Sequence, residues 1–326
     1  MMEFSVLDQV PLSRGDSPEE AIKKSIELIK WTEELGYKRY FVAEHHNTTG
    51  LISNSPDILM TRLLSATETI EVGSGGILLP QYSPFNIAEK ALLMESMFPG
   101  RVNIGVGNSP GGTELTRLAL TDGADSKLSD YTTMLADLIG FMHNSLPVDH
   151  RFRRVKAGPR INHQPPVYTL GLTENGARRA AKLGIGFIFG AFINPKHMEQ
   201  ALKIYYNEFQ PSVVMPKPQA IICIFIICCD TREEAKEHAK ILDHWLLNVT
   251  YGRDTTVPTA AEVADKNYSE KELKVIQENR KRCIVGNKED VKEALLKLPH
   301  ADEIMVICNI HDFEAKKRSY ELLKTL

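Results

Sequence analysis

The sequence predicts an α/β protein of the (β/α)8 TIM barrel class, with a helical insertion before the last strand. Three observations lead to this prediction. Short apolar runs alternate with amphipathic stretches, there are eight such runs, and several of them end in polar or glycine-rich residues. Open sheets more often contain about five or six strands, so the strand count favours a closed barrel.

Eight apolar runs of strand length are expected to form the barrel wall. In chain order they are residues 4–7, 40–43, 70–79, 102–106, 167–170, 186–189, 220–228 and 303–308.

The stretches between these runs carry apolar residues at three- and four-residue spacing and predict helices. The first opens with Ser17 as N-cap and Pro18 at the first helical position, and it closes at Gly36. The predicted helices are residues 17–35, 56–67, 84–97, 129–143, 175–183, 195–209 and 312–326.

Two segments interrupt this alternation. Residues 146–166 form an excursion rich in Pro, His and Arg, and residues 230–300 form a highly charged, mostly helical insertion. Neither has its own set of strands or a large apolar core, so residues 1–326 are expected to form a single domain.

Composition narrows the range of functions. The chain has 326 residues, 25% of them charged, and a formal net charge of −3, which gives no reason to expect nucleic acid or an anionic membrane as partner. No signal peptide is predicted, and the longest apolar run is about half of the ~20 residues that a membrane span needs. The five cysteines show no C-x-x-C spacing. We therefore expect a cytoplasmic protein with buried thiols and no metal.

Glu44, His45 and His46 directly follow the strand predicted at residues 40–43. The carboxyl ends of parallel strands are where α/β proteins place their chemistry. Adjacent residues of an extended chain face opposite ways, so the two histidines are not expected to chelate a metal. Histidine titrates near neutral pH, which favours a role in proton transfer or anion binding over a core position.

Glycine-rich segments lie within or at the ends of two further predicted strands. Gly73–Gly76 predicts either a bulge at the barrel rim or close approach of a ligand to the backbone. The segment from Gly105 begins like the dinucleotide motif G-x-G-x-x-G, but Pro110 occupies the third glycine position and no helix pattern follows at once. Its backbone amides can still cup a phosphate or the edge of a ring.

The junction at residues 170–177 predicts a strand, a turn and a helix start. A helix start offers free N–H groups and a positive dipole end, which suit a phosphate. The alternative is an ordinary N-cap by Thr173 or Asn175 without any ligand.

Taken together, these segments resemble the bacterial luciferase-like flavin monooxygenase family, most closely its single-chain luciferase family oxidoreductases. The resemblance runs nearly end to end and is strongest over residues 1–112. It rests on residues 5–11, 41–47, 66–73, 77–80, 100–105, 109–112, 230–235, 284–286 and 301–305.

The resemblance implies a barrel that binds FMN, delivered in reduced form by a separate flavin reductase. The reduced flavin reacts with O2 to give a C4a-hydroperoxide, which oxidises an aldehyde or another small organic substrate. A homodimer is also implied. By position, His45 matches the catalytic histidine, with His46 and Glu44 assisting. Gly75 and Gly76 match a non-proline cis peptide beneath the flavin ring.

The resemblance also implies the remaining cofactor contacts. The residues that match the lining of the ring and ribityl phosphate are Gly107, Asn108 and Ser109, and those that match the phosphate-binding turn are Thr173, Asn175, Gly176 and Ala177. Two departures stand out. Asn108 replaces an arginine of the luciferases, and Leu172, Thr173 and Gly176 replace a serine-rich turn of many single-chain members. One charge and two hydroxyl groups for the phosphate are therefore missing.

Two other functions stay open. One is a deazaflavin-dependent oxidoreductase that transfers hydride without O2. The other is a flavin-binding or partner barrel without catalysis, which the changes at Asn108 and Gly176 would permit.

Overall fold

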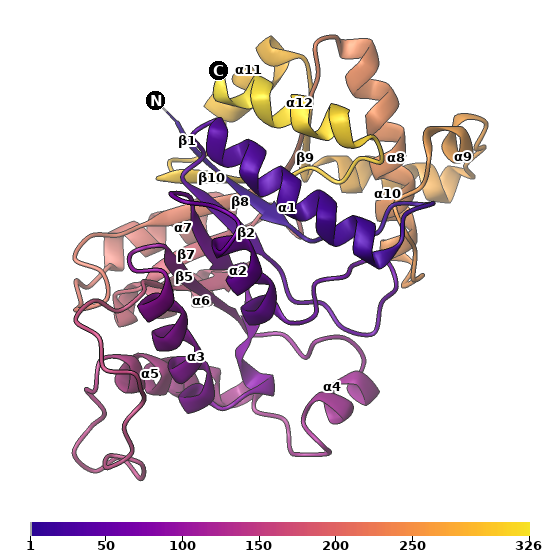
Figure 1. Ribbon diagram of the computed structural model, residues 1–326. Helices are drawn as coiled ribbons and strands as arrows, with labels where there is room; N and C mark the ends of the chain where they lie inside the picture. The colour runs from indigo at the N-terminus through magenta and orange to yellow at the C-terminus, as the bar shows by residue number, and fades with distance from the viewer. Residues whose placement is uncertain (1) are drawn as a thin grey trace.

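Eight parallel strands close into a barrel in the computed structural model, which describes residues 2–326 (Figure 1). The wall runs β1, β2, β3, β5, β6, β7, β8 and β10, and β10 pairs with both β8 and β1, which closes the ring. The strands are β1 (Glu3–Asp8), β2 (Arg39–Val42), β3 (Glu71–Ser74), β4 (Ile77–Leu78), β5 (Val102–Gly107), β6 (Val167–Gly171), β7 (Gly186–Gly190), β8 (Ala220–Cys228), β9 (Cys283–Gly286) and β10 (Glu303–Ile307). The predicted barrel class is confirmed.

Helices surround this wall, and Figure 1 shows α1 and α12 side by side. All the predicted helices are present, with ends shifted by a few residues. The helices are α1 (Pro18–Glu34), α2 (Pro56–Leu64), α3 (Pro84–Met97), α4 (Glu114–Leu120), α5 (Tyr131–Met142), α6 (Glu174–Leu183), α7 (Met198–Glu208), α8 (Arg232–Thr250), α9 (Ala260–Ala264), α10 (Glu270–Arg280), α11 (Lys288–Leu296) and α12 (Phe313–Lys324). Short 3₁₀ turns occupy Leu79–Gln81 and Leu128–Asp130.

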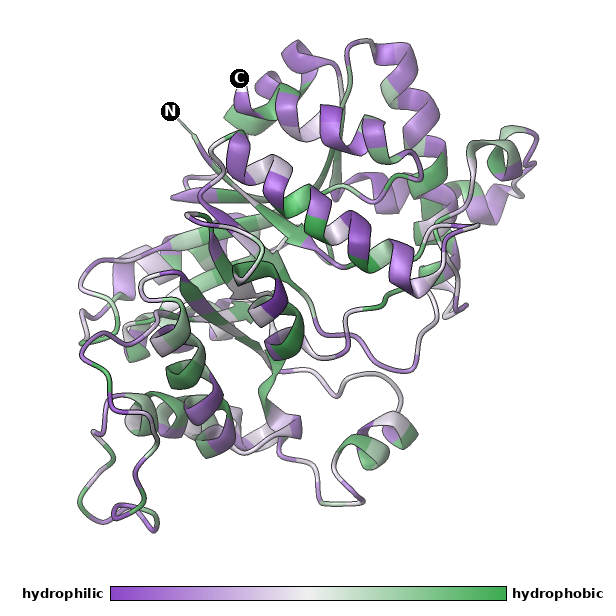
Figure 2. Ribbon diagram, viewed as in Figure 1, coloured by the Kyte–Doolittle hydropathy of each residue, from purple (hydrophilic) through white to green (hydrophobic). Residues whose placement is uncertain are grey.

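The core lies within the barrel and between its wall and the helices. Figure 2 shows the strands mostly in the green of apolar residues, while the outer helices carry much of the hydrophilic purple. All nine residues of β8 are buried, because β7 and β10 flank it and helices cover it. In α6 the small residues Ala177, Ala180 and Ala181 face the wall, which lets this helix pack closely. Across residues 2–326 no helix combines the length and apolar character needed to cross a bilayer.

The strand predicted over residues 70–79 is divided in the structure. β3 ends at Ser74 and β4 begins at Ile77, and the Gly75–Gly76 peptide bond between them is cis. The reason for small residues here is the closeness of β5. A Cβ atom at Gly105 would lie 2.0 Å from the carbonyl oxygen of Ser74, and one at Gly76 would lie 2.7 Å from the carbonyl oxygen of Gly105. The backbones meet where side chains would not fit.

Two elements were not predicted. β9 lies inside the charged insertion of residues 230–300 and pairs with the C-terminal half of β8. It was missed because its four residues stand between charged helices. The helix α4 follows the glycine-rich turn after β5, and Thr113 caps it by accepting a hydrogen bond from the N–H of Thr116.

Candidate functional site

A cavity of about 950 Å³ opens at the carboxyl ends of the barrel strands. Residues that follow β1, β2, β5, β6 and β7 line it, and so do the Gly75–Gly76 segment and residues of α8. Such a cavity at this face of a parallel barrel is the usual place for a ligand.

The structure gathers eleven of the twelve predicted site residues on the wall of this cavity. They are Glu44, His45, His46, Gly75, Gly76, Gly107, Asn108, Ser109, Thr173, Asn175 and Gly176. Ala177 is different, because its side chain is fully buried in the core and its N–H donates to the carbonyl of Thr173. This residue shapes α6 and does not contact the cavity.

Glu44 is held by three hydrogen-bonding groups. Its side chain is fully buried, and its Oε1 lies 2.8 Å from His46 Nε2 and 2.5 Å from the hydroxyl of Tyr82. Its Oε2 accepts a hydrogen bond from the N–H of Leu78 (2.8 Å). Residues two apart in extended chain share a side, so Glu44 and His46 meet. Glu44 therefore positions His46 and ties the end of β2 to β4.

His45 lines the cavity, and one nitrogen of its ring lacks a hydrogen-bond partner. Its Nδ1 is buried and has no hydrogen-bond partner in the structure. Burial lowers the pKa of His45 to about 4, and His46 adds a smaller effect in the same direction. The ring is therefore neutral at pH 7. A buried polar atom without a partner is uncommon in proteins and marks His45 as a residue that is not explained by packing alone.

The glycines of the wall leave room for a flat ring. No heavy atom lies within 4 Å of the position that a Cβ atom would take at Gly107, which faces open space. Gly75 and Gly76 line the same cavity. Apolar side chains line the cavity as well, among them Leu78, Leu170 and Phe192. This wall fits an aromatic ring system that lies close to the backbone.

The start of α6 forms another part of the wall. Thr173 is its N-cap and accepts a hydrogen bond from the N–H of Gly176 (3.2 Å), as the ligand-free interpretation expects. The hydroxyl hydrogen of Thr173 stays available to a ligand, and the first N–H groups of a helix lack partners within it. A phosphate therefore fits here even though Asn108 and Gly176 bring no charge.

Sequence reasoning missed several residues of the wall. Arg179 of α6 was one, and its signal was the four-residue spacing from Asn175, which puts both on one helix face. Trp245 and Val249 come from α8, within the segment that the sequence marked only as a charged insertion.

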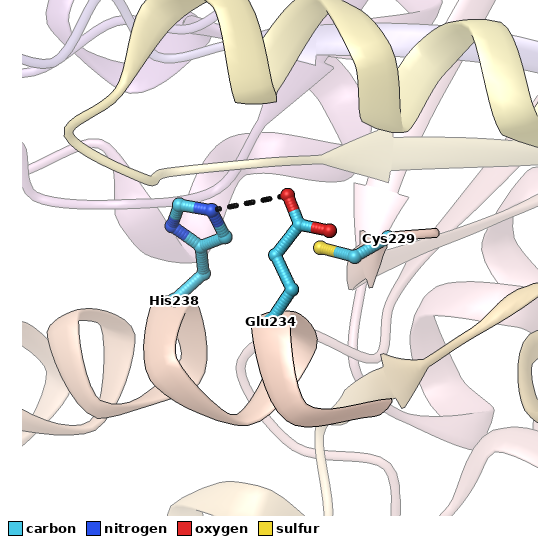
Figure 3. Close-up of side chains that lie close together, drawn as sticks. All are labelled: Cys229, Glu234 and His238. Carbon is cyan, nitrogen blue, oxygen red and sulfur yellow. Dashed lines mark ion pairs between the residues drawn. The ribbon is translucent and has the colours of Figure 1, made fainter. Parts of the chain in front are cut away.

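A second group of potential ligands lies elsewhere. Cys229, Glu234 and His238 each place one ligand atom within 4.8 Å of the others (Figure 3). Cys229 directly follows β8, the other two lie in the first two turns of α8, and none of the three lines the cavity. Burial, followed by nearby Glu234, raises the pKa of the Cys229 thiol to about 12, so the protonated thiol is a poor metal ligand. The expectation of no metal stays a prediction.

A family model described as luciferase-like monooxygenase matches residues 2–301. The chain belongs to the luciferase-like monooxygenase family. This luciferase-like chain is 49% identical to the YceB protein of Bacillus subtilis (strain 168), over 100% of the chain and 99% of that protein. It is 33% identical to a luciferase-like monooxygenase of Escherichia coli (strain K12), over 98% and 95%. Membership confirms the resemblance and makes the protein an oxidoreductase of this class.

Solved structures agree with the luciferase-like fold. Apo-MsnO8 matches with a TM-score of 0.91 and 28% identity, over 100% of this chain and 98% of the other. Two structures at 15% identity share the fold alone. The oxygenating constituent of a 3,6-diketocamphane monooxygenase of Pseudomonas putida, in complex with FMN, has a TM-score of 0.73 over 99% and 97%. An F420-dependent secondary alcohol dehydrogenase has a TM-score of 0.72 over 98% and 97%.

Proposed function

We propose that this luciferase-like protein is a reduced-FMN-dependent monooxygenase that uses O2 to oxidise an aldehyde or another small organic substrate. The observation that carries the proposal is the position of His45, which has an unpartnered ring nitrogen and lines the same cavity as the open glycine wall. The wall offers a place for a flavin ring, and His45 offers a proton-transfer group beside it.

Different residues of the cavity wall would bind the ring and the phosphate of the flavin. Gly75, Gly76 and Gly107 would lie against the flavin ring, and Thr173 and Asn175 would hold its phosphate. Reduced FMN, when bound, supplies the electrons for the activation of O2. The apolar part of the wall, including Trp245, Phe192 and Leu172, would exclude water from the reacting groups.

His45 would act as a neutral proton donor or acceptor at Nδ1. Its depressed pKa keeps it uncharged near pH 7, so the ring can either donate or accept, according to its tautomer. Glu44 and His46 would act beside it. Because Glu44 is already held by three groups, we assign it the positioning of His46 and not a proton transfer of its own.

The proposal includes a supplier of electrons. The turn that begins at Gly105 has Pro110 in the third glycine position of the dinucleotide motif, which argues against reduction by a nicotinamide bound at that turn. We therefore propose that a separate flavin reductase delivers reduced FMN. We also propose a homodimer in the cytoplasm, as the family resemblance implies.

A deazaflavin-dependent hydride transfer is the second candidate. It is supported by the F420-dependent alcohol dehydrogenase that shares this fold at nearly the same TM-score as the FMN complex. The two candidates differ in their use of O2, since hydride transfer to or from a deazaflavin consumes none.

The test is an anaerobic titration of the protein with reduced FMN, followed by mixing with oxygenated buffer and a panel of small aldehydes. We expect tight binding, and O2 uptake matched by oxidised product instead of H2O2. His45→Ala should abolish product formation, while His197→Ala, at an exposed site outside the cavity, should not. Unchanged product formation by His45→Ala would contradict the role of His45. Binding of F420 with no O2 uptake would favour the second candidate.

A further inference from the structure

One part of the cavity wall carries a cation without a carboxylate partner. Arg179 lines the cavity together with Thr173 and Asn175, from the first turns of α6. Within residues 2–326 no carboxylate oxygen lies within 4 Å of its guanidinium. The preceding Arg178 behaves differently, because it pairs with Glu208 of α7 (3.1 Å) and does not line the cavity.

The guanidinium of Arg179 is held in place by neutral groups. Its Nε donates to the hydroxyl of Thr132 (2.8 Å), and its Cζ lies 5.2 Å from the centre of the Tyr131 ring. Tyr131 is itself buried, and its hydroxyl donates to the carbonyl of Val106 in β5 (3.0 Å). A fixed aromatic ring therefore orients Arg179 without neutralising its charge. The guanidinium keeps N–H donors for an anion.

We infer that Arg179 binds the phosphate monoester of the flavin cofactor and makes the protein select FMN over riboflavin. This inference rests on the proposed function. Thr173 and the start of α6 supply neutral donors, and Arg179 supplies the full positive charge that Asn108 does not. The other arginine of the cavity wall, Arg253, belongs to the segment after α8 and stacks on Tyr251. It is the competing candidate for the anion.

The test compares two flavins that differ only in the phosphate. Dissociation constants for reduced FMN and reduced riboflavin are measured by anaerobic calorimetry for the full chain and for Arg179→Met, a change that keeps much of the packing on Tyr131. The variant should bind FMN about 10- to 100-fold more weakly, as for the loss of charged hydrogen bonds. Its affinity for riboflavin should be unchanged. Arg179→Lys should recover part of the preference, and Arg178→Met should bind both flavins as the parent chain does.

The outcomes separate the inference from the function on which it rests. If Arg179→Met weakens both flavins equally, or if Arg253→Met and not Arg179→Met removes the preference for FMN, the assignment to Arg179 is overturned and flavin binding stands. If the parent chain binds neither flavin, the proposed function fails and the inference fails with it. Thermal unfolding of each variant confirms that the compared proteins are folded.

Discussion

Two parts of the cavity wall are built in different ways. After β2, the Glu44 side chain is fully buried and its two oxygens meet three partners. At the start of α6, Thr173 is exposed and Arg179 is half-buried, and both keep unused hydrogen-bond donors. The first region holds side chains in fixed positions, whereas the second offers groups to a ligand. Substitutions in the first should therefore cost stability, and those in the second should cost mainly affinity.

The largest loss of stability is expected for Glu44→Ala. The change leaves the N–H of Leu78, the hydroxyl of Tyr82 and the ring of His46 without their acceptor. Unsatisfied buried groups of this kind should lower the free energy of unfolding by about 3 kcal/mol. Urea denaturation measures the effect, and Glu199→Ala, on the exposed face of α7, should leave the urea midpoint unchanged. If Glu44→Ala lowered the free energy of unfolding as little as Glu199→Ala does, the two regions would not differ in the way described.

Alanine substitutions at Gly105 and Gly107 should have different effects, the first on stability and the second on ligand binding. Gly105→Ala would place a methyl group against the Ser74 carbonyl, so the backbone must shift, at a cost of about 1–3 kcal/mol. Gly107→Ala meets nothing within 4 Å and should leave the free energy of unfolding nearly unchanged. The same methyl group would enter the cavity and weaken FMN binding. Thermal unfolding and flavin titration of both variants give the comparison, and equal unfolding temperatures would contradict it.

Acid should destabilise the protein through His45. The folded-state pKa of about 4 lies below the ordinary value of 6.5, so the unfolded chain binds the proton more readily. The contribution of the neutral ring is fully present above about pH 6.5 and is lost as the pH falls towards 4. His45→Gln should flatten this part of the curve of unfolding free energy against pH. An unchanged curve would show that the ring is not sheltered from solvent.

A modest loss of stability is expected for Thr173→Ala. This change removes the N-cap of α6 and should cost about 1 kcal/mol. Because the hydroxyl also faces the cavity, FMN affinity should fall while riboflavin affinity stays the same. Thr231→Ala, which uncaps α8 outside the cavity, is the matched control for the capping effect. If Thr231→Ala weakened FMN binding as much as Thr173→Ala does, the loss of affinity would come from general destabilisation of the barrel and not from the Thr173 hydroxyl.

Local signals in the sequence account for much of what was predicted. Ser17, Pro18 and Gly36 mark the ends of α1 because capping depends only on neighbouring residues. The residues after β2, β5 and β6 could be brought together because parallel strands end at one face of a barrel.

The remaining features depend on contacts between distant segments. The spacing from Asn175 gives the helix face of Arg179, but its contact with Tyr131 depends on where α6 packs. Trp245 belongs to a segment that the sequence marked only as a charged, mostly helical insertion, and its place depends on how α8 packs. The four residues of β9 form a strand only because they pair with β8, a contact that their own sequence does not reveal.

The position of Trp245 and Val249 has a consequence for the evolution of this enzyme class. These side chains reach the cavity from an insertion between β8 and β10, whereas the glycines and His45 belong to the first half of the barrel. The two sets of residues can therefore change independently. A lineage can remodel the insertion while the residues of the first half stay unchanged. A laboratory library restricted to α8 should therefore alter the cavity without altering His45 or the glycine wall.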